Sequence, residues 1–348
     1  MNKARKKKNI GKDARPRAER DDLSEEGSNL EPTEQKEKLI KIDYAIGGQA
    51  VIEGIMMRSP NFVATSVRKK DGSIKTKEDK FQSLIRKYRL LNIPLVRGVI
   101  NLVEMMVIGM GAVNFSANEF VEDEEDEKEA AEKSKFFEVF TFAFSILLSL
   151  VLAIFLFKFI PLAVAEFLRS HFSFIENHYV IFNLIDGVVR IAIFFGYLLF
   201  LSRFKDFRRV FQYHGAEHMA IFTYENELPL TTDNVRKHSP RHPRCGTSFL
   251  ILVLLTSMVV YTFVPRHPEF ALNLLRRLAV VPLIAGIGYE ILKWSAKYRD
   301  HALVRLLVAP GIWTQHITTR QPDDDQIEVA ITTLNSTLKL EQDHAKES

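Results

Sequence analysis

The segment from Phe140 to Phe157 contains no charged residue, and this run limits the possible folds more than any other feature of the chain. An apolar helix of about 20 residues crosses the roughly 30 Å hydrocarbon layer of a bilayer. We therefore predict a membrane span over Phe136–Ile160. Comparable runs predict three more spans, at Tyr179–Leu201, Gly246–Val264 and Leu278–Trp294. The chain is expected to be an α-helical polytopic membrane protein with about four spans, embedded in a lipid bilayer.

Lys and Arg residues predict how these spans are oriented. The loop at 202–245 is rich in both residue types, whereas the loop at 161–178 contains only Arg169. Cytoplasmic loops carry the excess of Lys and Arg, so we expect the 202–245 loop and the basic N-terminus in the cytoplasm. Four spans would return the C-terminus to the same side. The sequence thus predicts a multi-pass protein of the cytoplasmic membrane with both termini inside the cell.

Composition also indicates soluble segments at the N-terminal side. Residues 1–38 are polar and charged, which predicts a disordered arm. Residues 39–94 contain β-like runs on both sides of Asp71-Gly72, a pair that favours a tight hairpin in which both turn residues have positive φ. An amphipathic helix is expected to follow over 81–93. We therefore predict a small β-containing cytoplasmic unit before the membrane bundle.

Further segments complete the predicted organisation. Residues 95–118 are apolar but include charged and small residues, so we favour a helix packed at the membrane surface or inside the bundle over a fifth span. Residues 119–135 are rich in acidic residues and predict a solvated linker. The membrane bundle would then occupy 136–308, and a cytoplasmic C-terminal segment would occupy 309–348.

Charge and cysteine content exclude some classes of protein. The net charge of +4 over 348 residues is too small to indicate nucleic-acid binding, and no basic face is interleaved with aromatic residues. Cys245 is the single cysteine, so the chain forms no intramolecular disulfide and suits a reducing compartment. We therefore expect no nucleic-acid partner.

The strongest chemical motif is His214-Gly215-Ala216-Glu217-His218, in the predicted cytoplasmic loop. On a helix, residues four apart lie on one face, where two imidazoles can bind a divalent metal such as zinc. Glu217 stands directly before the second His, as in the inverted zinc-protease motif, where the carboxylate acts as a general base toward water. The alternative interpretation is a surface helix with two solvated histidines.

A catalytic metal needs a third protein ligand, and three residues are candidates. His242 and Cys245 come just before the third predicted span and offer an imidazole and a thiolate. Glu290 is an ionisable residue inside the fourth predicted span, where such residues are functional candidates by default. The alternatives are a structural ion pair for Glu290 and a small buried residue for Cys245.

Two further polar features call for interpretation. The segment Gly47–Pro60 begins with two adjacent glycines, which allow the backbone to approach another group closely. Within this segment, further candidates for presentation at a site are Gln49, Glu53 and Arg58; the alternative is a tight β-turn that only packs. Inside the second predicted span, Asp186 and Arg190 are four residues apart, which predicts a structural ion pair on one helix face.

Several blocks of the chain resemble the YqhQ-like family of bacterial membrane proteins. The blocks are Gly47–Pro60, Tyr213–His218 with Thr223-Tyr224-Glu225, His242–Phe249, Ala309-Pro310-Gly311 and Thr318–Asp323. They follow one another in order between residues 44 and 335. The resemblance implies a membrane protein and makes metal dependence the expectation for the histidine motif, but it implies no particular reaction or substrate.

Two functions from different classes follow. The first is a membrane-embedded metal-dependent hydrolase, such as a protease, that acts at the cytoplasmic face, with Glu217 activating water beside a metal at His214 and His218. The second is a non-catalytic membrane protein, such as an assembly factor, a metal sensor or a transporter. Four spans without an internal repeat argue against a transporter. The enzyme requires the two histidines and a third ligand to converge with a coordination position left open.

Overall fold

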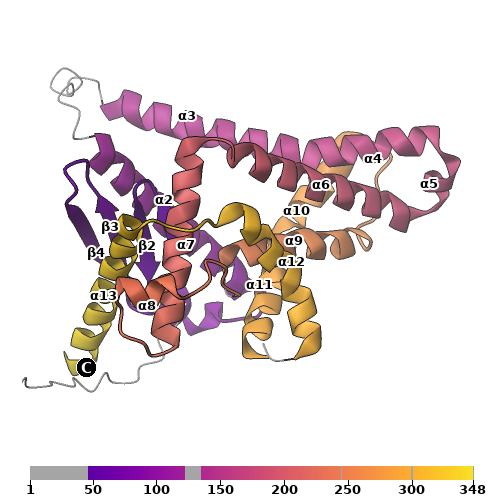
Figure 1. Cartoon of the computed structure of the whole chain (residues 1–348). Coiled ribbons are helices and arrows are strands. Elements are labelled where there is room, and N and C mark those ends of the chain that lie inside the picture. Colours follow the sequence, from indigo (N-terminus) through magenta and orange to yellow (C-terminus); the bar gives the residue numbers. More distant parts are fainter. Residues whose placement is uncertain (1–45, 122–134, 244, 299–300, 348) are drawn as a thin grey trace, which may run out of the picture. The chain divides into compact units, whose positions relative to one another are not determined.

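The structure is a computed structural model, and it describes residues 46–121, 135–243, 245–298 and 301–347. The arm expected at 1–38 and most of the linker expected at 119–135 lie outside the described residues. The described part is mainly helical and contains one small antiparallel β-sheet near its N-terminal side, as the sequence predicts (Figure 1).

The β-sheet consists of four strands that follow one another in the chain. They are β1 (Gly47–Val51), β2 (Gly54–Arg58), β3 (Phe62–Arg68) and β4 (Ile74–Lys80). Neighbouring strands pair antiparallel in chain order. Short turns set the register, with Val51 opposite Gly54 and Arg68 opposite Ile74. The β-containing unit predicted from the sequence is therefore confirmed.

The turn between β3 and β4 differs from the expected one in its backbone. Gly72 has a φ of 87°, and its N–H donates to the carbonyl oxygen of Lys69 at 3.0 Å. Asp71 does not have positive φ, so the expected turn with two left-handed residues is wrong. A single left-handed glycine after a tight turn is typical of a longer hairpin loop. Asp71 contributes through its carboxylate, which accepts the N–H of Ser73 at 2.8 Å.

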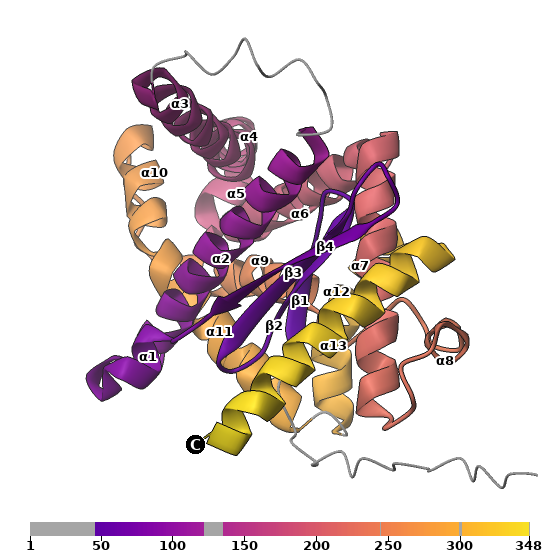
Figure 2. The same ribbon diagram turned by 90° about the vertical axis from the view of Figure 1, so that its left-hand side faces the viewer.

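Helices cover both faces of the sheet. They are α2 (Val96–Val121), α7 (Lys205–Glu225) and α13 (Asp324–Glu347). Side chains alternate between the faces of a strand, so Ile55 and Met57 pack toward α7 and α13, whereas Met56 packs toward α2. Figure 2 shows α2 on one side of the sheet and α7 and α13 on the other. The sheet is thus the middle layer of a three-layer unit.

Helix α2 is long and apolar enough to cross a membrane, and one of its faces packs against the sheet and the segment that follows the sheet. Glu104 accepts the backbone N–H of Leu84 at 2.7 Å, and Glu119 accepts from Lys75 Nζ at 2.6 Å. The other side of α2 exposes apolar side chains such as Val107. Helix α2 thus has one face on protein and one exposed apolar face, and its position at the membrane surface or inside the bundle rather than across the membrane stays a prediction.

The remaining apolar helices form the membrane part. They are α3 (Lys135–Ile154), the π-helical turn η4 (Phe155–Phe159), α4 (Ile160–His171), α6 (Tyr179–Leu201), α9 (Gly246–Tyr261), α10 (Phe270–Ala279) and α11 (Val281–Lys297). By length and composition, the candidate spans in the described chain are Val96–Phe120, Ala143–His171, Tyr179–Leu201 and Phe270–Ser295. A polytopic membrane fold is therefore confirmed.

Two expected spans have different bounds in the structure. The helix expected to end at Ile160 continues to His171 through the π-helical turn η4, and Pro161 lies in the first turn of α4. The span expected over Gly246–Val264 ends at Tyr261. A helix of 16 residues rises about 24 Å, less than the roughly 30 Å hydrocarbon layer. Helix α9 is thus a short apolar helix packed among longer ones.

The helix expected over 81–93 is also shorter. It is reduced to α1 (Leu84–Lys87) and a 3₁₀ turn, η1 (Arg89–Leu91), because Tyr88 between them has an extended backbone. Leu90 is 86% exposed, so its apolar side chain gains little packing that would stabilise a longer helix. The other helices are α5 (Ser173–Asn177), α8 (Thr232–Arg236) and α12 (Ala302–Thr318).

Candidate metal centre

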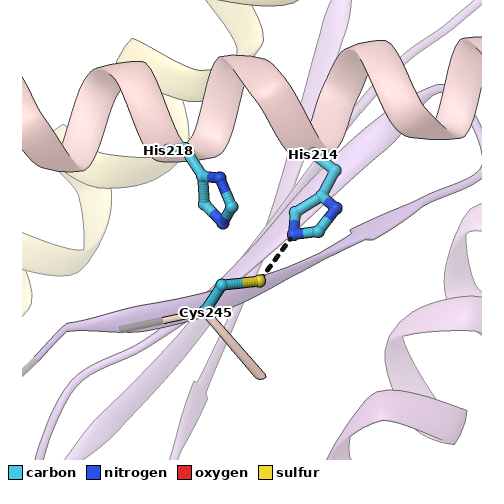
Figure 3. A group of neighbouring side chains, drawn as sticks. All are labelled: His214, His218 and Cys245. Atoms are coloured by element: carbon cyan, nitrogen blue, oxygen red, sulfur yellow. Dashed lines mark hydrogen bonds between the residues drawn. The ribbon is translucent and has the colours of Figure 1, made fainter. Parts of the chain in front are cut away.

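The predicted histidine motif is helical, and its two imidazole rings lie on one face. His214 and His218 belong to α7, and their ring centroids are 4.4 Å apart. Figure 3 shows both rings extending from the same side of α7 toward Cys245. The side chains therefore converge as the four-residue spacing predicts.

Backbone carbonyl groups fix the tautomer of both rings. His214 Nδ1 lies 2.8 Å from the carbonyl oxygen of Thr318, and His218 Nδ1 lies 2.7 Å from that of Pro240. A carbonyl oxygen only accepts, so in each pair the imidazole Nδ1–H is the donor. Each neutral ring therefore keeps its lone pair on Nε2. Metal-binding histidines typically have this arrangement, with the second ring nitrogen donating to an outer partner.

Cys245 supplies a third donor next to the two imidazoles. It is the N-cap residue of α9, and its Sγ accepts the backbone N–H of Thr247 at 3.4 Å. The Sγ atom lies 3.1 Å from Nε2 of His214. The potential ligand atoms of the three residues His214, His218 and Cys245, which we call the three-donor group, all lie within 4.8 Å of one another.

The spacing and chemistry of the three-donor group fit a zinc ion. Bond lengths of about 2.0–2.1 Å to nitrogen and 2.3 Å to sulfur place tetrahedral donors roughly 3.3–3.6 Å apart. Separations of at most 4.8 Å therefore require side-chain movements of about 1 Å. Imidazole and thiolate are ligands that zinc prefers. Three protein donors would leave one tetrahedral position open, as in catalytic zinc sites.

Glu217 is buried beside the three-donor group. The backbone N–H of Gly48 in β1 donates to its carboxylate, whereas Oε2 has no hydrogen-bond partner. Burial raises the pKa of Glu217, and the nearby His214 and His242 partly offset this rise. A carboxyl group with a raised pKa is a better proton acceptor near neutral pH than an exposed one.

Gly215 explains how the carbonyl group of Thr318 reaches the motif. A side chain at Gly215 would collide with the carbonyl oxygen of Arg320, so the chain that leaves α12 passes directly over α7. The N–H of Arg320 donates to the carbonyl oxygen of Phe211 at 2.9 Å and fixes this crossing. The close approach requires a residue without Cβ, and it places Thr318 against His214.

His242 lies beside the three-donor group without belonging to it. Its ring centroid is 5.7 Å from that of His218, and its Nε2 lies 3.4 Å from the carboxylate of Glu225. Its backbone N–H donates to Oε1 of Gln315 at 2.8 Å, and its carbonyl oxygen accepts from Nε2 of Gln315 at 2.8 Å. Of the two candidates before α9, the structure thus brings Cys245 to the histidines.

Glu290 lies elsewhere, against α2. Its carboxylate forms an ion pair with Arg97, whose Nε donates to it at 2.7 Å. The backbone N–H of Leu95 also donates to it, at 3.4 Å. A carboxylate in an apolar helix is costly unless it is paired, and Arg97 satisfies it. The structural alternative fits Glu290, and we leave it out of the proposed ligands.

Glu53 contacts α7 through a different turn of that helix. It occupies the β1–β2 turn with a φ of 48°, and its carboxylate accepts two hydrogen bonds from Arg209, each of 2.5 Å. The hydroxyl of Tyr213 donates to the same carboxylate at 3.2 Å. Glu53 therefore anchors the hairpin to the residue that precedes His214.

Arg58 and Gln49 lie on the face of the sheet that packs against α2. The guanidinium of Arg58 is 4.1 Å from the ring centroid of Phe81, and its Nη1 contacts Met105. The side chain of Gln49 fills the space over Gly109, where a Cβ would collide with it. The three-donor group is on the other side of the sheet, so neither residue is brought to it.

Sequence reasoning missed the backbone groups that support the motif. The carbonyl groups of Thr318 and Pro240 have no side-chain signature, so no residue type marks them. The adjacent glycines Gly47 and Gly48, by contrast, did indicate one of these backbone contacts. They predicted a close backbone approach, and Gly48 is the residue that approaches Glu217.

Comparisons with known proteins agree with the resemblance noted above. A family model described as "Protein of unknown function (DUF1385)" matches residues 93–340. The chain is 37% identical over 310 residues to the "Uncharacterized protein YqhQ" of Bacillus subtilis (strain 168), which covers 86% of this chain and 94% of that protein. No solved structure matches the chain. The three-donor group lies within the residues matched by the family model.

Proposed function

This chain belongs to the DUF1385 family of proteins of unknown function, and we propose that it is a metal-dependent hydrolase at the cytoplasmic face of the membrane. The three-donor group would hold a divalent metal, and its imidazole and thiolate donors favour zinc. Glu217 would be the general base. The supporting observation is that both Nδ1 atoms are occupied by backbone carbonyls, which leaves both Nε2 lone pairs beside the cysteine sulfur.

A metal held there would supply a Lewis acid that polarises a substrate carbonyl or a water. The residues of the chain have separate roles around it. The carbonyls of Thr318 and Pro240 orient the imidazoles, and the N–H of Gly48 holds one side of the Glu217 carboxylate. The unpartnered Oε2 of Glu217 is free to accept a proton from water during hydrolysis.

The position of the site in the chain supports a substrate at the membrane surface. Helix α7 begins shortly after α6 ends at Leu201, and Cys245 caps the first turn of the apolar α9. Helix α7 therefore follows one membrane helix closely, and Cys245 stands at the start of another. A scissile peptide or ester bond of a membrane-bound substrate would reach this level of the bilayer.

The alternative is a non-catalytic metal site that stabilises the fold or senses the metal. Burial favours this alternative, because His218 is 2% and Cys245 is 6% exposed. The number of donors favours the enzyme, since structural zinc sites almost always have four protein ligands and the group in the described residues has three. Glu217, with its unpartnered buried oxygen, also has no function in a purely structural site.

Metal analysis of the full-length protein in detergent tests the metal part of the proposal. We expect close to one zinc per chain in the wild type and a clear loss in His214→Ala, because two remaining donors bind an ion weakly. His316→Ala is the matched control, since His316 is exposed and its ring hydrogen-bonds to the carbonyl of Trp313. Equal metal content in all three proteins would exclude the three-donor group as the site.

A further inference from the structure

The segment Leu84–Val96, which joins the sheet to α2, exposes several large apolar side chains. We call it the connecting segment, and it includes α1 and η1. Its exposed apolar residues are Leu84, Tyr88, Leu90, Ile93 and Val96, with exposed fractions from 44% to 86%. Single exposed apolar residues are normal on a protein surface, whereas a group of them marks a contact with a partner or a membrane. The connecting segment is therefore a candidate contact surface.

Both ends of the connecting segment are fixed to helices. At its start, the carboxylate of Glu104 in α2 accepts the backbone N–H of Leu84 at 2.7 Å. Near its end, the backbone N–H of Leu95 donates to Glu290 of α11 at 3.4 Å, and a Cβ at Gly286 would lie 2.7 Å from the carbonyl oxygen of Leu95. Leu95 has a φ of 71°, a left-handed conformation that a bulky residue adopts only when its surroundings enforce it. The fold itself therefore holds the conformation in which the apolar side chains are exposed.

The contacts with α11 give the connecting segment a level relative to the membrane. Helix α11 is the second part of the candidate span Phe270–Ser295. Lys293 and Trp294 are exposed near the end of this helix, and the exposed Tyr298 follows it. Tryptophan, tyrosine and lysine at the end of a span are typical of the membrane–water interface. Glu290 precedes Trp294 by one helical turn, a rise of about 6 Å. The connecting segment therefore lies close to the level of the interface.

Positive charges stand between the exposed apolar residues. Arg86, Lys87 and Arg89 are all exposed, and the sequence from Leu84 to Val96 contains no acidic residue. Arg86 also donates to the carbonyl oxygen of Pro60 at 3.2 Å, so it is partly engaged with the sheet. Segments that bind at a membrane surface combine buried apolar side chains with cations that attract anionic lipids. The connecting segment has both properties.

The surroundings of the connecting segment favour the bilayer over a protein partner. Figure 2 shows α1 beyond the end of the sheet, at the start of α2. Exposed apolar side chains continue along α2 at Val103, Met106 and Val107. A protein partner would need an apolar surface and carboxylates placed to match this segment. A bilayer offers apolar chains and anionic phosphates at the level that the contacts with α11 indicate.

We propose that the connecting segment is an interfacial membrane anchor that binds anionic phospholipids. Tyr88, Leu90 and Ile93 insert into the boundary between headgroups and acyl chains, and Lys87 and Arg89 contact the headgroup phosphates. The anchor does not span the bilayer. It holds the start of α2, and with it the sheet, at the membrane surface. The anchor is independent of the three-donor group.

Fluorescence quenching in vesicles tests the insertion with the full-length protein. Leu90→Cys in a Cys245→Ser background carries a nitrobenzoxadiazole label, and the 86% exposure of Leu90 means that the label disturbs little packing. The vesicles contain phosphatidylglycerol and phosphatidylcholine, part of which carries a nitroxide on the acyl chain near the headgroup. We expect the nitroxide to lower the emission at least about twofold and dissolved iodide to lower it little, because an interfacial segment lies at the acyl boundary.

Leu228→Cys in the same background is the matched control. Leu228 is also an exposed leucine, but it lies between α7 and α8. A label there should be quenched by iodide and not by the lipid nitroxide. Absence of lipid quenching at position 90, or equal lipid quenching at both positions, overturns the anchor. Protection of position 90 from iodide without lipid quenching would identify a protein partner or a second copy as the occupant, and also overturns it.

Charge variants test the preference for anionic lipid. Lys87→Gln together with Arg89→Gln should reduce the lipid quenching at position 90 in vesicles with phosphatidylglycerol to the level found with phosphatidylcholine alone, because the attraction to the headgroup phosphates is lost. Lys237→Gln together with Arg241→Gln removes two exposed cations elsewhere and should leave the quenching unchanged. Equal quenching in the two lipid mixtures, or no effect of the Lys87 and Arg89 changes, overturns the binding of anionic phospholipids.

Discussion

Gly48 and Glu217 are in direct contact, although they belong to a strand and a helix far apart in the sequence. The backbone N–H of Gly48 donates to the Glu217 carboxylate, and a Cβ on Gly48 would lie 3.0 Å from Cδ of Glu217. The strand therefore closes over the carboxylate and leaves room for nothing larger than hydrogen. Any movement of β1 is transmitted to the proposed general base.

Gly48→Ala should destabilise the protein and displace Glu217. The new methyl group would also lie 2.6 Å from the carbonyl oxygen of Met56, a backbone atom that cannot move without disturbing the sheet. Overpacking of this kind typically costs about 1–3 kcal/mol. Gly47→Ala is the matched control, because a Cβ there meets nothing within 4 Å. Thermal unfolding of both variants checks this, and equal midpoints would contradict the described contact.

Glu217→Gln should separate catalysis from metal binding. Glutamine keeps the size of the side chain but cannot accept the proton, and loss of a general base typically slows a reaction by about 10²–10⁴. We expect the metal content to stay near the wild-type value while complementation of a deletion strain fails. Full complementation by Glu217→Gln together with failure of His214→Ala would favour the non-catalytic metal site instead.

The metal-free protein should lose stability as the pH falls from about 7 toward 5.5. Burial lowers the pKa of His218 below its usual 6.5, so the unfolded chain takes up a proton in this range before the folded chain does. Stability therefore rises with pH here, by at most about 1.4 kcal/mol per pH unit. Chemical denaturation in the presence of a chelator, measured at several pH values, gives this slope.

Glu217 contributes a slope of opposite sign to the same measurement. Its raised pKa means that the folded protein keeps a proton that the unfolded chain has lost, so its contribution to stability falls as the pH rises above about 4.5. The His218 effect is therefore best measured in a Glu217→Gln background. Adding His218→Gln to that background should flatten the profile, and an unchanged slope would assign the effect to another group.

Cysteine labelling tests the orientation predicted from Lys and Arg. In a Cys245→Ser background, a cysteine in place of Phe172, which is exposed between α4 and α5, should react with an impermeant reagent from outside intact cells. A cysteine in place of Asp233, exposed on α8, should react only after permeabilisation. The reverse pattern would place the histidine motif outside the cell and would show that α2 crosses the membrane.

The sequence predicted the elements that depend on local pattern. Apolar runs identified the membrane helices, and the four-residue spacing of His214 and His218 placed both rings on one face. The sequence alone could not identify the third metal ligand, because this ligand depends on which distant segments lie next to α7 in the fold. Cys245 reaches the histidines through the start of α9, whereas Glu290 meets Arg97 on another helix.

Helix α13 shows why part of the three-layer unit was not predicted from the sequence. Its buried face includes Thr333 and Thr337 beside Leu334, so apolar residues alone do not mark a clear stripe. Both threonine hydroxyls donate to backbone carbonyls of their own helix, which makes them acceptable in a core. Because of these hydroxyl groups, the sequence pattern does not mark this face of α13 as buried. The face is recognised only from the elements that pack against it in the structure.

The layered unit also sets an order of assembly during protein synthesis. Arg68 of β3 contacts Glu328 of α13, which follows it by 260 residues. At roughly 5–20 residues per second, the ribosome needs about 10–50 s to synthesise the intervening chain, which includes the membrane helices. During that interval α13 does not yet cover the sheet face that carries Ile55 and Met57. A chaperone or the bilayer surface must cover this apolar face instead. Slow translation of the membrane segments should therefore favour aggregation of the nascent chain.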